Sequence, residues 1–348
     1  MNYRNIFITL AALSGTVTAS AWSAESATVA FLMPDQASTR YEQHDFPGFM
    51  AEMSKLCADC KVIYQNANAN ASLQQQQFNS VIAQGAKVIV LDPVDSSAAA
   101  ALVENAQAQG VKVIAYDRPV PDKPADFYVS FDNEGIGYAI AKSLTDHLKA
   151  SGVPQDAGVL QINGSPTDAA AGLIRDGIHR GLKESGYKTL AEFDTPEWAP
   201  PKAQEWTAGQ VTRFGDKIKG VVAANDGTGG GAIAAFKAAG VQPLPPVTGN
   251  DATIAALQLI IAGDQYNTIS KPSEIVAAAA AKVAVDFIQG KKPQASTALY
   301  NTPSQLFTPE VVTAKNIKAE IFDKKIQNWD QVCSGEYAAA CQKLGISK

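Results

Sequence analysis

The chain has 348 residues, of which 46% are hydrophobic, so it is long enough for two domains with packed cores. Its formal net charge is −5 and its pI is near 5.3. An acidic chain without blocks of like charge disfavours nucleic acid and anionic membrane surfaces as partners.

The N-terminal residues 1–24 are predicted to be a signal peptide. Arg4 precedes an apolar run at 6–12, and Ala19-Ser20-Ala21 matches a small-residue cleavage signal. The apolar run is too short to span a bilayer, which argues against a membrane anchor. We therefore expect cleavage near residues 21–24 and a soluble, exported mature protein.

A first series of alternating strands and helices follows. The helix after the second strand is expected to turn Leu73, Phe78, Val81 and Ile82 inward. The strands are nearly continuous runs of apolar residues, which is typical of a parallel sheet covered on both faces. Strands are expected at 28–33, 61–64, 87–91 and 112–116, and further helices at about 47–56 and 94–109.

The segment 111–137 ends this series and starts another. Its first strand delivers Asp117 and Arg118 at its carboxyl end, and a proline-rich turn leads to a second strand at 127–131. Asp132 or Asn133 can cap the helix that follows. Ligands of open α/β sheets bind at the carboxyl ends of strands, so this segment is predicted to be both a binding edge and a crossing between lobes.

A second series repeats the pattern, which predicts an α/β protein with two Rossmann-like lobes built on parallel sheets. The N-terminal lobe is expected to hold residues 25–132 and 271–298, and the C-terminal lobe residues 133–270 and 299–348. Strands are expected at 158–162, 189–193, 220–224, 247–249, 266–270 and within 299–312, and helices at 168–185, 202–214, 228–239, 253–262 and 273–289.

The four cysteines lie in two close pairs. In an oxidising compartment, Cys57–Cys60 and Cys333–Cys341 are predicted to be local disulfides. A redox C-x-x-C motif lacks thioredoxin-like flanks here, and a zinc site lacks ligand spacing in the second pair.

Catalytic motifs are scarce. The histidines His44, His147 and His179 share no motif, although His44 is near the expected cleft. Gly227–Ala232 fits the dinucleotide pattern G-x-G-x-x-A, so an exported nucleotide-dependent enzyme is the alternative function. Against it, Asp226 would face the pyrophosphate, and we favour helix capping by Asp226 and close packing of the glycines.

Polar and aromatic residues recur where strands end, and these ends collect on one edge of each sheet. Carboxylate, amide and guanidinium groups suit sugar hydroxyls, and aromatic rings suit the C–H faces of a pyranose. We therefore predict a sugar site between the lobes, without a cofactor or metal, formed by Arg40, Tyr41, Asp117, Arg118, Asp168, Trp198, Asn225, Asp251 and Lys271.

The motifs STRYE, VIVLDPVDS, VIAYDR, FYVSFDNEGIG, GSPTD, VVAANDGTGGGAI, TGNDA and SKP together resemble those of periplasmic sugar-binding proteins of ABC transporters. The likeness is to the ribose/xylose/galactose group, and within it to D-xylose-binding and multi-sugar-binding proteins. It covers about residues 28–289.

This resemblance implies a type I periplasmic binding protein, whose lobes are joined by a three-segment hinge and close on one sugar. The other crossings are expected near Lys271 and near 299–306. It further implies a monosaccharide ligand (xylose, another aldopentose or an aldohexose), no enzymatic activity and a monomeric state. A membrane permease is the implied partner, and a chemoreceptor is a possible second one. A sugar-responsive DNA regulator is disfavoured, because the chain starts with an export signal and not with a basic helix-turn-helix.

Overall fold

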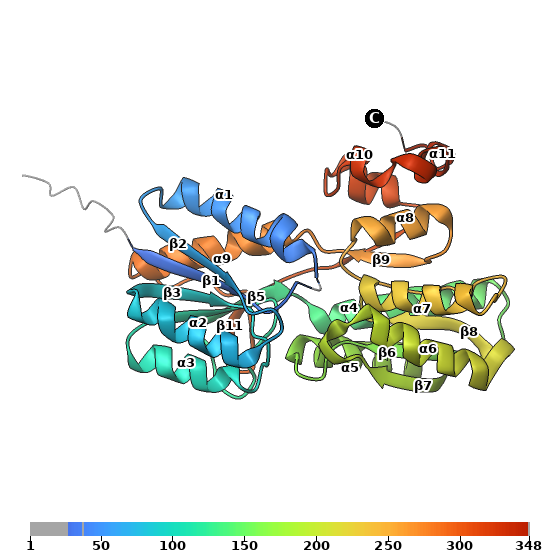
Figure 1. The fold of residues 1–348 in the computed structure, drawn as a ribbon, viewed down its shortest axis with the longest axis horizontal. Coiled ribbons are helices and arrows are strands. Elements are labelled where there is room, and N and C mark those ends of the chain that lie inside the picture. The colour runs from blue at the N-terminus through green and yellow to red at the C-terminus, as the bar shows by residue number, and fades with distance from the viewer. Residues whose placement is uncertain (1–26, 37, 347–348) are drawn as a thin grey trace, which may run out of the picture.

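The computed structural model describes residues 27–36 and 38–346, and the predicted signal peptide lies outside them. The described chain forms two α/β lobes side by side, joined near the middle of the molecule (Figure 1). This confirms the predicted fold class of two lobes with mostly parallel sheets.

The N-terminal lobe is built on a seven-stranded sheet in the order β10-β11-β5-β4-β3-β1-β2, in which only the β10–β11 pair is antiparallel. Helices α1 and α9 cover one face and α2 and α3 the other, so the central strands are buried on both sides. The elements are β1 (Thr28–Met33), η1 (Tyr41–Asp45), α1 (Phe46–Leu56), β2 (Lys61–Asn66), α2 (Ala71–Ala83), β3 (Ala86–Leu91), α3 (Ala99–Ala108), β4 (Lys112–Tyr116), β5 (Phe127–Phe131), α9 (Ser273–Ile288), β10 (Thr297–Leu299) and β11 (Thr302–Phe307).

The C-terminal lobe is built on the parallel sheet β7-β6-β8, and a separate antiparallel pair, β12-β9, lies beside it. Helices α4 and α5 pack together, as do α6 and α7. The elements are α4 (Asn133–Ala150), β6 (Gly158–Asn163), α5 (Ala169–Ser185), β7 (Lys188–Asp194), η2 (Pro196–Trp198), α6 (Pro200–Phe214), η3 (Gly215–Lys217), β8 (Ile218–Ala223), α7 (Asp226–Ala238), α8 (Ile254–Ala262), β9 (Asn267–Ser270), β12 (Glu310–Thr313), η4 (Lys318–Asp323), α10 (Trp329–Val332), η5 (Gly335–Tyr337) and α11 (Ala338–Lys343).

The chain crosses between the lobes after β5, after β9 and after β11. The first and third crossings are tied together, because the backbone N–H of Asp132 donates to the Phe307 carbonyl at 2.9 Å. Residues 299–307 were expected in the C-terminal lobe, but β11 pairs with β5, with Ser304 opposite Tyr128, and so extends the N-terminal sheet. The third crossing therefore falls after Phe307.

Two predicted elements differ in the structure. The helix expected from Val94 begins at Ala99, because the Asp95 carboxylate accepts hydrogen bonds from the Ser97 and Ala98 N–H groups and holds a turn there. The strand expected at 247–249 is reduced to a single bridge between Val221 and Val247.

Both predicted disulfides, Cys57–Cys60 and Cys333–Cys341, are present. The second one closes the C-terminal module, residues 318–346, whose buried side chains pack on α8. No helix of the described chain combines the length and the apolarity needed to cross a membrane.

Helices α4 and α5 approach each other so closely that glycines are required between them. A Cβ at Gly177 would overlap the Glu134 carbonyl oxygen, so we expect Gly177→Ala to lower the free energy of unfolding by about 2 kcal/mol or more. Gly172→Ala in the same helix is the control, because a Cβ there meets no heavy atom within 4 Å. It should leave stability unchanged or raise it by up to ~1 kcal/mol. Urea unfolding measures both, and equal effects would contradict the packing argument.

Candidate functional site

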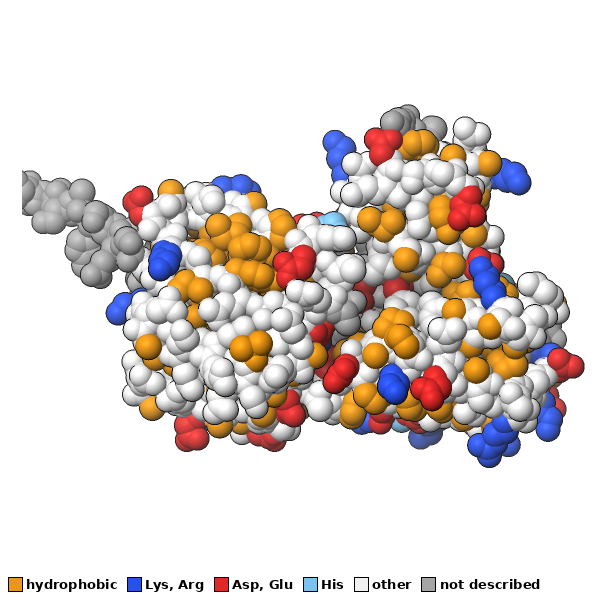
Figure 2. All heavy atoms as spheres, viewed as in Figure 1, with side chains coloured by type: hydrophobic (Ala, Val, Ile, Leu, Met, Phe, Trp, Pro, Cys, Tyr) orange, Lys and Arg blue, Asp and Glu red, His pale blue; other side chains and the backbone are white. Residues whose placement is uncertain are grey.

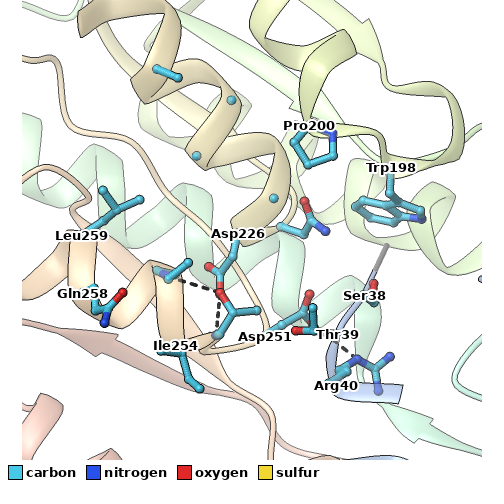
Figure 3. A pocket seen from close by; sticks show the side chains of 18 of the residues that line it. Ser38, Thr39, Arg40, Trp198, Pro200, Asp226, Asp251, Ile254, Gln258 and Leu259 are labelled. Atoms are coloured by element: carbon cyan, nitrogen blue, oxygen red, sulfur yellow. Dashed lines mark hydrogen bonds and ion pairs between the residues drawn. The ribbon is translucent and has the colours of Figure 1, made fainter. Parts of the chain in front are cut away.

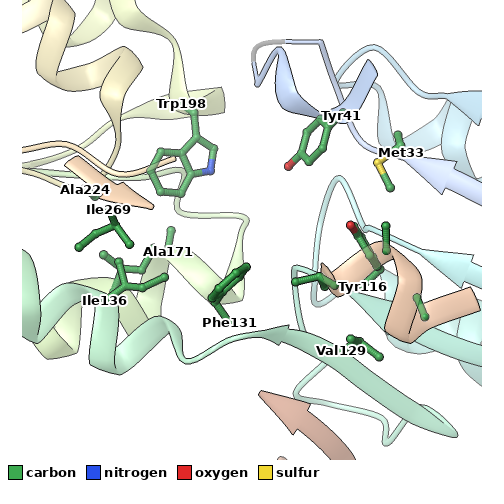
Figure 4. Packing of buried hydrophobic residues seen from close by; sticks show 14 of the residues in the cluster. Met33, Tyr41, Tyr116, Val129, Phe131, Ile136, Ala171, Trp198, Ala224 and Ile269 are labelled. Carbon is green, nitrogen blue, oxygen red and sulfur yellow. The ribbon is translucent and has the colours of Figure 1, made fainter. Parts of the chain in front are cut away.

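All nine residues predicted to form the site line one cavity between the lobes. Tyr41 comes from the N-terminal lobe and Trp198 from the C-terminal lobe, on opposite sides of it (Figure 4). The molecular surface is hollowed where the lobes meet (Figure 2). The complete lining is Ser38, Arg40, Tyr41, Asp117, Arg118, Asn133, Asp168, Ala170, Ile174, Trp198, Asn225, Asn250, Asp251 and Lys271.

Asp117 is held in an unusual backbone conformation directly after β4. Its φ of 57° is rare for a residue with a side chain. Its carbonyl oxygen accepts hydrogen bonds from the Tyr128 hydroxyl at 2.7 Å and the Ser130 hydroxyl at 2.9 Å, which hold this conformation. Burial opposes ionisation, but Arg40 and Lys271 outweigh it and lower the pKa of Asp117 to about 2. The strand end therefore presents a permanent carboxylate to the cavity.

Arg40 carries the positive charge nearest to Asp117. Its guanidinium donates to Asp117 at 2.5 Å and to the buried Asp45 at 2.7 Å, and its Nε lies 3.9 Å from the Asp251 carboxylate. The Tyr116 hydroxyl also donates to Asp45, at 2.5 Å. Arg40 is thus fixed from behind by Asp45 and faces the cavity between two acidic side chains.

Arg118 is surrounded by acidic groups. Its Nη2 donates to Asp35 at 2.8 Å, and its Nε lies 3.4 Å from Asp92 and 3.3 Å from Asp168. Asp168 belongs to the C-terminal lobe, so this ion pair joins the two lobes. Burial raises the pKa of Asp92 well above its usual value, against the opposing charge of Arg118.

Asp168 and Trp198 form a unit at the start of α5. Asp168 caps the helix by accepting from the Ala170 N–H at 2.8 Å, and its other oxygen accepts from the Trp198 indole N–H at 3.0 Å. The indole ring covers Gly164, where any Cβ would overlap it. Trp198 itself has a φ of 55° and is buried. These contacts fix the plane of an aromatic ring at the cavity wall.

Asn225, not Asp226, caps helix α7. The Asn225 side chain accepts from the Thr228 N–H at 2.9 Å in a capping box, which corrects the expectation that Asp226 would be the cap. The Asp226 carboxylate instead accepts from the Thr253 N–H at 2.8 Å, the Thr268 hydroxyl at 2.7 Å and the Gln265 amide at 3.1 Å. Asp226 therefore anchors the segment that carries Asp251.

Asp251 and Lys271 complete the C-terminal side of the cavity. Asp251 has a φ of 105° and Ala252 one of 49°, so this turn is strained and needs its anchors. The Lys271 amino group lies 3.2 Å from Asp251 and 3.5 Å from Asp117. Lys271 follows β9 and thus bridges acidic groups from both lobes at the second crossing.

The charges that line the cavity balance. Three cationic side chains, Arg40, Arg118 and Lys271, face three acidic ones, Asp117, Asp168 and Asp251. Among the described residues, no group of three or more His, Cys, Asp and Glu side chains could hold a metal ion. A neutral polar ligand fits such a lining better than an ion does, because it leaves no net charge buried.

The sequence did not lead us to assign Asn133 and Asn250 to the site, although both line the cavity. The Asn250 side-chain oxygen is buried without a hydrogen-bond partner among the described residues, so it can accept from a ligand. Both asparagines follow predicted strands, and this signal could have identified them. Asn133 donates to the Tyr128 and Ser130 hydroxyls, while Asp132 is the residue that caps α4.

The glycine-rich turn and the three histidines have structural roles or lie outside the central cavity. Gly229 and Gly231 permit close packing of α7, since a Cβ at these positions would lie 2.6 Å from the Thr248 carbonyl oxygen and 2.5 Å from that of Pro200.

His44 lies outside the central cavity. A hydrogen bond with Glu274 raises the pKa of His44, against the opposing effect of burial. His147 stacks on Tyr266, and His179 pairs with Glu192.

Comparison with known proteins gives the family. A profile of the periplasmic binding protein domain matches residues 29–292. This chain belongs to the periplasmic binding protein family. The D-xylose-binding periplasmic protein of Escherichia coli K12 is 36% identical over 326 residues, which cover 91% of this chain and 96% of that protein. A multiple sugar-binding periplasmic receptor of Rhizobium radiobacter is 28% identical, with 94% and 99% covered.

Solved structures agree with this assignment. An ABC transporter solute-binding protein from Clostridium phytofermentans with bound β-D-glucose has a TM-score of 0.78 at 25% identity, covering 88% of this chain and 99% of that one. A myo-inositol-binding protein from Caulobacter has a TM-score of 0.74 at 26% identity, covering 86% and 97%. The homologues are solute-binding proteins and not enzymes. The predicted type I fold and the predicted family are confirmed. The family also implies a periplasmic location.

Asp226 should make stability depend on pH. Burial and the neighbouring charge of Asp251 raise its pKa to about 7 in the folded protein, from 3.8 as the ordinary value. The folded state therefore holds this proton more tightly than the unfolded state does. The resulting stabilisation is fully present below pH 3.8 and is lost as pH rises through about 7, by at most ~1.4 kcal/mol per pH unit.

The comparison of wild type with Asp226→Asn isolates this effect, because all other titrating groups are shared. We expect the unfolding free energy of wild type relative to the variant to fall between pH 5 and pH 7. Guanidinium unfolding at several pH values measures it. A difference that stays constant over this range would show that Asp226 is ionised throughout.

Proposed function

We propose that this protein captures a neutral monosaccharide in the cavity between its lobes, as the binding component of a sugar ABC transporter. The observation that carries the proposal is a charge-balanced set of buried polar groups between two aromatic rings. The candidates are D-xylose, another aldopentose or an aldohexose. The names of the relatives, which bind D-xylose or several sugars, support this range.

The side chains suit the hydroxyl groups of a sugar ring. A hydroxyl both donates and accepts, so it can bridge a carboxylate and a cation such as Asp117 and Arg40. The Tyr41 and Trp198 rings offer apolar surfaces for the C–H faces of the ring. Ala170 and Ile174 supply an edge of the cavity without hydrogen-bonding side chains, which suits the unsubstituted C5 of a pentopyranose.

Binding would exchange contacts between protein groups for contacts with the sugar. The lobes are closed on each other, since the Ser96 N–H donates to the Thr167 carbonyl at 2.9 Å and the Ala169 N–H to the Ser96 hydroxyl at 3.1 Å. In this arrangement the central cavity measures about 30 Å³, because its charged side chains contact each other. A sugar would enter when the lobes open by hinge bending, and its hydroxyls would then replace these ion pairs.

The closed, loaded form would deliver its sugar to the membrane permease of the transporter. We infer a monomer as the working state, because one chain supplies both lobes and the whole lining of the cavity. A chemoreceptor is a possible second partner of the closed form. The predicted signal peptide would place the protein in the periplasm for either contact.

Calorimetric titration with D-xylose, L-arabinose, D-ribose, D-glucose and D-galactose tests the proposal. We expect at least one of these sugars to bind to the folded, ligand-stripped protein with one site per chain. An absence of heat for the whole panel, with circular dichroism showing a folded protein, would exclude the monosaccharide function.

Arg118→Ala should weaken sugar binding by several kcal/mol if its guanidinium makes buried hydrogen bonds to the ligand. The variant also leaves Asp35, Asp92 and Asp168 without their cation, so its fold must be verified first. Arg175→Ala, at a partly exposed position with a 3.7 Å pair to Asp194, is the control and should bind as wild type does. An unchanged dissociation constant for folded Arg118→Ala would remove Arg118 from the site.

Trp198→Ala should cost about 1–3 kcal/mol of sugar binding, because it removes a ring that packs on the sugar. Trp206→Ala is the matched control, since Trp206 stacks on Phe193 at 5.3 Å and does not line the cavity. Calorimetry with the best sugar of the panel compares the two variants. Equal losses in both would indicate a general effect on folding and not a contact with the sugar.

A further inference from the structure

A groove much larger than the central cavity opens beside it. It has a volume of about 620 Å³ and lies between α6, α7, α8 and the segment that precedes η1. Figure 3 shows Trp198 and Pro200 on one side of it and Gln258 and Leu259 on the other, with Asp251 and Arg40 lower in the view. A volume in this range is typical of small-molecule sites.

The groove and the central cavity share part of their walls. Arg40, Trp198, Asn225 and Asp251 line both. Each of these side chains therefore has one side toward the proposed sugar position and another toward the groove. A substituent on a sugar in the central cavity would pass between them into the groove.

Helix α7 presents an open face to the groove. Gly227, Gly230 and Ala234 line it, and their spacing places them on one side of the helix. A Cβ at Gly230 would meet no heavy atom within 4 Å, so this glycine serves no packing contact. Its neighbours Gly229 and Gly231, by contrast, are needed for packing, since Cβ atoms there would overlap backbone atoms of other segments. Gly230 instead leaves space free in the groove.

Polar groups for a ligand are present along the walls. Asn225 is only 8% exposed, and its amide nitrogen donates to no protein group within the described ranges. The side chains of Gln43 and Gln204 also line the groove and make no hydrogen bond to any described residue. Pro200 and Ile254 add apolar surface. This mixture of free amides and apolar patches matches the hydroxyls and C–H faces of a sugar ring.

We propose that the groove binds a second sugar ring, so that the protein takes a disaccharide as well as a monosaccharide. The first ring would occupy the central cavity, and the glycosidic bond would lie between Trp198 and Asp251. The inference rests on the proposed monosaccharide function, because Asp117, Arg118, Asp168 and Lys271 line the central cavity and not the groove.

A smaller opening on the other side of the cavity is a weaker candidate for the second ring. It measures about 290 Å³ and shares Arg118 and Trp198 with the central cavity. Its remaining charged groups, Asp35, Asp95 and Glu197, are all acidic. The larger groove has more shared wall and more uncharged donors, and therefore suits a neutral ring better.

Gly230→Phe tests the proposal, because its side chain would fill the groove without touching the central cavity. Gly209→Phe is the matched control: Gly209 also lies in a helix, has no heavy atom within 4 Å of a Cβ position and does not line the groove. Calorimetry compares D-xylose and D-glucose with xylobiose, cellobiose and maltose for both variants and for wild type.

We expect wild type to bind at least one disaccharide, and Gly230→Phe to weaken that binding at least tenfold while monosaccharide binding changes less than twofold. Gly209→Phe should change neither. Monosaccharide binding without disaccharide binding in wild type would overturn the second ring and leave the proposed function intact. Equal effects of the two variants, or equal loss of both ligands in Gly230→Phe, would also overturn it. A folded wild type that binds none of the sugars would instead exclude the monosaccharide function itself.

Discussion

The pairing of Asp117 with Arg40 and Lys271 is the interaction on which the site depends. Asp117 follows β4, Arg40 precedes η1 and Lys271 follows β9, so the three charges connect both lobes and one crossing. Each charge is buried, and each would be costly without the others. The arrangement therefore requires all three backbone segments to be placed correctly, and the hydrogen bonds to the Asp117 carbonyl serve this placement. A sugar hydroxyl can enter such a network because it donates and accepts at once.

Much of the site could be predicted because parallel strands place their carboxyl ends on one edge. Asp117 and Arg118 were recognisable from the apolar run at 112–116 that precedes them, and the structure brings them to one cavity. The prediction of Trp198 is less direct, because it rests on the aromatic and proline content of its loop and not on a preceding strand. The strands at 112–116 and 127–131 were predicted with their observed bounds, because their apolar runs are flanked by clear turn residues.

Other features depend on contacts that a single sequence does not reveal. Asn225 and Asp226 are both good helix caps, and only the position of Thr253 decides that Asp226 bonds elsewhere. The place of β11 follows from its pairing with β5, although its sequence suits either lobe. Asp35 and Asp92, which surround Arg118, follow strands β1 and β3. An acidic residue after a strand is common, so their sequence positions alone do not indicate that they contact Arg118. These residues support the binding groups from behind, and their role depends on distances of a few ångströms.

The ion pairs between the lobes have a consequence for how the protein responds to its ligand. Arg118–Asp168 at 3.3 Å and Arg40–Asp251 at 3.9 Å attract the lobes toward each other even without a sugar. Buried ion pairs, however, lose in desolvation about as much as they gain in attraction, so their net contribution to closure is small. A ligand shifts an equilibrium between open and closed forms only by its difference in affinity for them. A sugar that contacts both lobes would bind the closed form more tightly than the open one, and this difference in affinity would shift the equilibrium toward closure.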